Sequence, residues 1–166
     1  MPVPYFDAHC DTITKFRSLR RAEKNHLDLE RLKKYAPCGQ VLALWSGPHM
    51  DGPAMYRRLL HTAERQVREN GDIAALCTSA ADYDAAAKEG KIALFLAVEG
   101  ANLLSCSVAG MLDAYRSGVR LVTLCWNQDN RLCAPSSGSI PKSCKAPVSM
   151  EISFPLSGIR PVVGTA

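Results

Sequence analysis

Short runs of apolar and β-branched residues recur along the first three quarters of the chain, and each run is bounded by polar, Gly or Pro residues. Runs of this length with such boundaries are typical of strands, and strands apolar throughout are buried on both faces. The sequence therefore predicts four buried parallel strands, at residues 3–9, 40–45, 91–98 and 120–126.

The segments between these runs have the periodicity of amphipathic helices. It is clearest at 54–70, where apolar residues recur every three or four positions and Arg residues occupy the opposite face. A second helix is expected at 79–89, with Ser79 as its N-cap, and a third at 108–117, ending before Gly118. Strands that alternate with helices predict an α/β fold with a parallel sheet, either a barrel or an open doubly wound sheet.

The last 35 residues differ in character from the rest. Five Pro residues and many Ser residues interrupt residues 132–166, and no helical or strand period is evident there. We therefore predict a folded domain at 1–131 and an irregular Pro- and Ser-rich tail at 132–166. This tail is either a flexible extension or a stretch outside the fold, as after a frameshift or truncation.

Composition narrows the class of protein. A hydrophobic content of 47% with 22% charged residues is that of a globular protein, and a net charge of +4 without concentrated basic patches argues against nucleic-acid binding. No apolar stretch is long enough to span a membrane, and the N-terminus lacks the layout of a signal peptide, so a cytoplasmic protein is expected. An odd number of cysteines, seven, favours reduced thiols.

Residues that suit a divalent cation follow two of the predicted strands. His9 and Asp11 end the first strand and point to the same side, because alternate strand residues share a face. Glu99 follows the third, entirely apolar strand, where a carboxylate is costly unless it is paired or bound to metal. Imidazole and carboxylate ligands suit zinc. The alternatives are a His that caps a loop and a Glu that pairs with a basic residue at the rim.

Two further polar or aromatic residues follow the fourth strand. Trp126 and Asn127 would lie over the same strand ends as the predicted metal ligands and could contact a substrate. The alternative is a Trp that only packs against its own loop.

Several motifs, in this order, resemble those of the renal (membrane) dipeptidase family: DAHCD, HLDLERL, GQVLALW, GKIALFLAVEG and YRSGVRLVTL, at 7–11, 26–32, 39–45, 90–100 and 115–124. The resemblance implies the first half, about four βα units, of a (β/α)8 barrel of the amidohydrolase type. It also implies two zinc ions, with His9 and Asp11 binding one of them and Glu99 bridging both. The implied activity is hydrolysis of dipeptides by a water that bridges the metals.

The chain departs from this family in two places. Trp126 stands where family members have a substrate-contacting His, and nothing in 132–166 matches the later metal-binding His residues or the proton-handling Asp. No catalytic residue is therefore identified, and we expect a truncated zinc dipeptidase that is inactive alone. The alternatives are a non-catalytic metal-binding or vestigial half barrel, and a related metallohydrolase acting on another substrate. Open edges at the first and fourth strands would favour self-association.

Overall fold

The computed structural model of the chain describes residues 5–15, 18–20 and 24–133. The described part is built around a parallel sheet of five strands. These are β1 (Tyr5–Cys10), β2 (Cys38–Trp45), β3 (Ala74–Leu76), β4 (Ile92–Glu99) and β5 (Val119–Thr123). The predicted tail falls outside the described residues except at 132–133, so its boundary stays a prediction.

Strand β4 is the centre of the sheet. One edge pairs with β2 along its whole length, from Ile92 opposite Cys38 to Glu99 opposite Trp45. The other edge is shared between β3, at the beginning of β4, and β5, at its end. Every residue from Ile92 to Val98 is buried, which explains why the sequence of β4 is apolar throughout instead of alternating.

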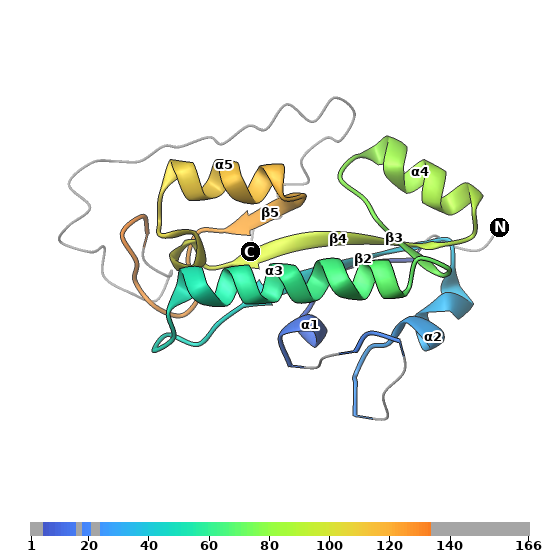
Figure 1. The fold of residues 1–166 in the computed structure, drawn as a ribbon, viewed down its shortest axis with the longest axis horizontal. Helices are drawn as coiled ribbons and strands as arrows, with labels where there is room; N and C mark the ends of the chain where they lie inside the picture. Colours follow the sequence, from blue (N-terminus) through green and yellow to red (C-terminus); the bar gives the residue numbers. More distant parts are fainter. Residues whose placement is uncertain (1–4, 16–17, 21–23, 134–166) are drawn as a thin grey trace.

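Three longer helices cover the sheet, namely α3 (Gly52–Glu69), α4 (Ala80–Lys88) and α5 (Val108–Arg116). The predicted helices are confirmed, with ends that differ by one or two residues. Shorter elements are α1 (Thr12–Lys15), α2 (Leu29–Leu32) and the 3-10 turns η1 (Lys33–Tyr35) and η2 (Ala101–Leu104). In Figure 1, α3 runs along the sheet, and α4 and α5 lie toward the two ends of β4. None of the helices in the described ranges is both long and apolar enough to cross a membrane.

The two faces of the sheet pack against different helices. Even-numbered residues of β2 and β4, such as Leu42 and Leu96, form one core with side chains from α3 and α5. Odd-numbered residues, such as Val41 and Phe95, form a second core with Ala86 of α4. In the sheet, β4 lies between β2 and β3. The connection from β2 to β3, which contains α3, therefore crosses the sheet in one direction, and the connection from β3 to β4, which contains α4, crosses it in the other. Because both connections are right-handed, α3 and α4 lie on opposite faces.

The structure corrects two sequence expectations. Strand β3 was not predicted, because its three residues are too few to show a period. The first and last strands, β1 and β5, are not buried as expected: they lie at the edges of the sheet, where Phe6 is 54% and Leu121 is 44% exposed. The predicted open edges are thus present in the described part of the chain.

A capping arrangement fixes the start of α4. The Ser79 hydroxyl accepts a hydrogen bond from the Asp82 N–H at 3.1 Å, as predicted for an N-cap. The Asp82 carboxylate in turn accepts bonds from the N–H and the hydroxyl of Thr78, at 2.8 and 2.9 Å. These bonds hold the pKa of Asp82 below its ordinary value of 3.8. The carboxylate therefore helps to join α4 to the segment that follows β3.

We expect Asp82→Asn to lower the free energy of unfolding by about 0.5–1 kcal/mol at neutral pH, the size of a partly exposed cap. Because the pKa is depressed in the folded state, the contribution is present above 3.8 and is lost as the pH falls through the folded-state value. Urea unfolding at neutral and strongly acidic pH measures the difference. Asp84→Asn, an exposed position of the same helix, is the matched control. Equal losses for both variants would contradict the capping role.

Candidate metal centre

A one-residue bulge interrupts the pairing of β1 with β2. The register pairs Phe6 with Gly39 and Asp7 with Gln40, and then Cys10 with Leu42, so that β1 advances three residues while β2 advances two. The Asp7 carboxylate accepts a hydrogen bond from the His9 N–H, at 3.0 Å, inside this bulge. A bulge of this kind changes which face the following side chains occupy.

The bulge brings His9 and Asp11 to the inner face of the sheet, the face of the second core. Before the bulge, the Phe6 ring lies on this face, 5.8 Å from the Phe95 ring. After it, Cys10 packs against the opposite core with Leu42. If the same sequence paired regularly, without a bulge, Phe6 and Cys10 would share a face and His9 would be on the other one. The predicted orientation, with His9 and Asp11 together and Cys10 away, is confirmed.

Glu99 reaches the same place from the neighbouring part of the sheet. It is the last residue of β4, and its side chain is only 16% exposed. Burial raises the pKa of Glu99 above its ordinary value, the negative charge of Asp11 adds to the increase, and His9 opposes it. The protein thus holds two carboxylates close together in a half-buried position, which favours a cation between them.

The three predicted ligands converge. His9 Nε2 lies 3.5 Å from Asp11 Oδ1 and 3.6 Å from Glu99 Oε2, and one ligand atom from each residue falls within 4.8 Å of the others. Asp11 Oδ1 is buried without a hydrogen-bond donor. A buried acceptor without a donor, beside a second carboxylate and an imidazole, fits a divalent metal, and this N and O donor set suits zinc. Among the described residues, the Glu99 carboxylate has His9 within salt-bridge distance and no Lys or Arg of the rim.

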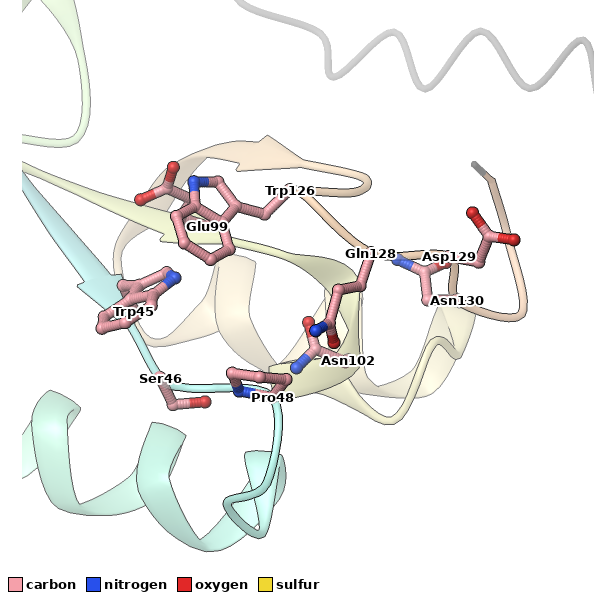
Figure 2. Close-up of a pocket in the computed structure, with 9 residues that line it drawn as sticks. All are labelled: Trp45, Ser46, Pro48, Glu99, Asn102, Trp126, Gln128, Asp129 and Asn130. Atoms are coloured by element: carbon pink, nitrogen blue, oxygen red, sulfur yellow. The ribbon is translucent and has the colours of Figure 1, made fainter. Parts of the chain in front are cut away.

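A pocket of about 140 Å³ adjoins these ligands, and Glu99 is part of its wall. The rings of Trp45 and Trp126 meet edge to face, with centroids 5.1 Å apart. Figure 2 shows the two indoles at one end of the pocket and the amides of Asn102 and Gln128 farther along it. Trp126 thus lies where a substrate contact was predicted, whereas Asn127 is exposed and does not line this pocket.

Several of the residues that line the pocket were not singled out from the sequence. Trp45 and Ser46 end β2 and begin the loop after it, so the rule that polar and aromatic residues gather at strand ends could have identified them. Asn102 lies in η2, directly after Glu99 and Gly100, and no sequence signal pointed to it.

The loop that carries Trp126 is organised by Asn130. Its side-chain amide donates to the Leu124 carbonyl at 2.6 Å, and its side-chain oxygen accepts from the N–H groups of Leu132 and Cys133, at 2.8 and 3.2 Å. One side chain therefore ties both ends of the segment after β5 together and fixes that wall of the pocket.

Comparison with known proteins places these features in a family. Residues 2–150 match the family described as membrane dipeptidase, peptidase family M19. Dipeptidase ataJ of Aspergillus terreus (strain NIH 2624 / FGSC A1156) is 30% identical over 152 residues, covering 79% of this chain and 37% of that protein. The match to the family extends to residue 150, into the segment predicted as a tail.

Solved structures agree with this result. A metallopeptidase from Rhodobacter sphaeroides, liganded with a phosphinate mimic of the dipeptide L-Ala-D-Ala, superposes with a TM-score of 0.68 at 17% identity, covering 81% of this chain and 48% of that one. The probable dipeptidase PvdM from Pseudomonas aeruginosa gives 0.63 at 19% identity, covering 80% and 37%. The chain therefore spans less than half the length of each of these relatives, and the predicted partial barrel is confirmed.

Proposed function

Because this chain belongs to the membrane dipeptidase family, peptidase family M19, we propose that it supplies the first metal-binding strands of a zinc-dependent dipeptidase. The observation that carries the proposal is the convergence of His9, Asp11 and Glu99 at the carboxyl ends of β1 and β4. Barrel enzymes place their chemistry at this end of the strands.

Each ligand has a role that its position supports. His9 and Asp11 would hold one zinc ion, and Glu99 would bridge it to a second, since its carboxylate faces His9 and lines the adjacent pocket. Bound zinc would polarise the scissile carbonyl and lower the pKa of a water molecule. The two indoles would shield this end of the pocket from solvent and position the peptide beside Glu99.

We propose that the 166-residue chain alone does not hydrolyse dipeptides. Among the described residues, His9, Asp11 and Glu99 form the one group that could hold a metal, and a two-metal site needs more ligands than these three provide. Catalysis would require further strands of the barrel. A non-catalytic metal-binding protein, or a hydrolase of another substrate, remains the alternative outcome.

The experiment is an assay of Ala–D-Ala and Ala–Ala hydrolysis by the purified chain with added Zn²⁺. We expect no turnover above the buffer rate, although zinc binds. His9→Ala is the control that separates a contaminating peptidase from this chain. Turnover that His9→Ala abolishes would show that the chain is a complete catalyst, and zinc-dependent cleavage of other amide or ester substrates alone would favour the alternative hydrolase.

The edges of the sheet support a proposal about association. Two of the edge strands, β1 and β5, expose Phe6 and Leu121, and exposed apolar edges promote pairing with other chains. We expect the protein to self-associate at micromolar concentration and Leu121→Lys to shift it toward the monomer, as measured by light scattering after size exclusion. Leu112→Lys, equally exposed on α5, is the matched control. The same shift in both variants would show that added charge acts generally and not at the edge.

A further inference from the structure

A second pocket lies between α1 and α3, on the other face of the sheet from the metal ligands. Its volume is about 430 Å³, and its lining includes Ile13 and Leu59, which belong to the core beneath α3. Figure 1 shows α1 beside α3. We propose that this α1–α3 pocket binds a small organic phosphate through Lys15, Arg58 and Arg65. The proposal does not depend on the dipeptidase function.

Three cations from two helices surround the pocket. Arg58 and Arg65 are seven residues apart on α3, which places them on one face of that helix, and Lys15 ends the neighbouring α1. Among the described residues, no carboxylate lies within salt-bridge distance of Lys15 or Arg58. No Asp or Glu of the described chain lines the pocket either. Cations that share a pocket without a counter-ion repel one another, so a bound anion is favoured.

Arg65 is held in place by an ion pair of its own. Its guanidinium donates to both carboxylate oxygens of Glu69 through one nitrogen, at 2.9 and 3.0 Å. A guanidinium has five N–H groups, so it can keep this pair and also donate to a ligand. Glu69 lies one turn farther along α3 and does not line the pocket, so it orients Arg65 without filling the site.

The walls of the pocket are fixed before a ligand binds. The Thr14 hydroxyl donates to the Ala43 carbonyl at 3.1 Å and accepts from the Trp45 N–H at 3.3 Å, which ties α1 to β2. Ile13 and Leu59 are buried side chains of the core. Because the lining belongs to packed elements, binding requires little further ordering of the chain.

Charge and size define the ligand class. A phosphate monoester carries about 1.5 to 2 negative charges at neutral pH and has three acceptor oxygens, which suits several cationic donors better than one carboxylate does. A volume of about 430 Å³ falls in the range of small-molecule pockets, roughly 300–1,000 Å³, so a bare phosphate would leave it partly empty. The aliphatic stems of the Lys and Arg side chains can pack against the organic part of the ligand.

The experiment is a calorimetric titration of the full chain at neutral pH and constant ionic strength, without added metal. The probes are phenyl phosphate, benzoate and benzyl alcohol, which have similar rings and different charges. We expect saturable binding of phenyl phosphate, at least about tenfold weaker binding of benzoate, and none of the alcohol. Equal affinity for phenyl phosphate and benzoate, or no saturable binding of phenyl phosphate, would overturn the proposal.

Two neighbouring residues of α3 provide a matched pair of variants. Arg58→Gln should weaken phenyl phosphate binding by about tenfold, because it removes a charged donor from the pocket. Arg57→Gln removes the same charge from an exposed residue that does not line the pocket, and should bind as the unchanged chain does. Equal losses in the two variants would show attraction to the whole surface and refute the site. Lys15→Gln, on the other helix, should repeat the loss and keeps the test valid if Arg58→Gln does not fold.

Two further measurements locate the site and the source of the phosphate. His9→Ala should bind phenyl phosphate as the unchanged chain does, since the α1–α3 pocket is on the other face of the sheet. Loss of binding in His9→Ala would place the ester at the metal centre and overturn the proposal. Sedimentation with phosphatidic acid vesicles that Arg58→Gln abolishes, without binding of phenyl phosphate, would assign the pocket to a lipid headgroup and refute a soluble ester.

Discussion

Glu99→Gln is expected to lower the affinity for Zn²⁺ by more than about 100-fold. Loss of a residue that only orients a metal ligand costs 10–100-fold, and Glu99 is itself a ligand in the proposed centre. The substitution keeps the size and shape of the side chain and removes its charge. Competition with a fluorescent zinc chelator at neutral pH measures the change.

The same substitution should make the zinc-free protein more stable at neutral pH. Burial raises the pKa of Glu99 in the folded state, so the folded protein gains stability from this group only where the carboxyl is protonated. That gain is complete below the ordinary pKa of 4.5 and is lost as the pH rises through the raised folded-state value. The stabilising effect of Gln should therefore be present at neutral pH and vanish in acid.

Glu89→Gln is the control for both measurements, because this exposed carboxylate pairs with Lys91 far from the centre. The proposed metal site would be refuted if Glu99→Gln bound zinc as tightly as Glu89→Gln. Weaker zinc binding together with higher stability would identify Glu99 as a residue retained for function at the expense of the fold.

Gly52→Ala is expected to lower the free energy of unfolding by about 2 kcal/mol. A Cβ atom on Gly52, the first residue of α3, would lie 2.6 Å from the Asn102 carbonyl oxygen and 3.2 Å from the Leu103 Cα. These are backbone atoms of η2, so the helix or the turn must move, and overpacking of this kind costs 1–3 kcal/mol. Because η2 directly follows Glu99 and Gly100, the displacement should also weaken zinc binding.

Gly71→Ala provides the comparison. A Cβ at Gly71, just after α3, would come no closer than 3.6 Å to other atoms, so this variant should differ little from the parent. Urea unfolding of the two variants gives the difference in stability, and the zinc titration gives the effect on the centre. Similar unfolding curves for both variants would show that α3 and η2 can move apart at little cost. Equal zinc affinity of both variants would show that the position of Glu99 does not depend on this contact.

Much of the fold follows from local patterns. Ser79 and Gly90 bracket α4 as the capping rules predict, and the apolar run of β4 reflects burial on both of its faces. The rest depends on neighbours in space. The apolar pattern of β1 predicted burial, and the open edge at which Phe6 lies was expected only from the resemblance to half a barrel. The three residues of β3 are too few to predict that it pairs with β4.

The metal ligands could be predicted because a polar residue at the end of an apolar strand is chemically conspicuous. The pocket could not, because its wall combines the end of β2 with the loop after β5, which are far apart in the sequence. Ser46 is conspicuous only in three dimensions, through the burial of its hydroxyl without a partner. Asn127 shows the opposite case: its neighbour Trp126 turns into the pocket, whereas its own side chain does not line it.

Because of the extra residue in β1, the residues before and after the bulge follow two separate patterns of alternation between the faces of the sheet. Tyr5 and Phe6 belong to one and His9 and Asp11 to the other. In evolution, a single-residue insertion or deletion before the bulge would shift the aromatic positions and leave His9 and Asp11 facing the same way. The bulge thus allows the aromatic edge of the sheet and the metal ligands to diverge independently, although only a strand of six residues, Tyr5–Cys10, connects them.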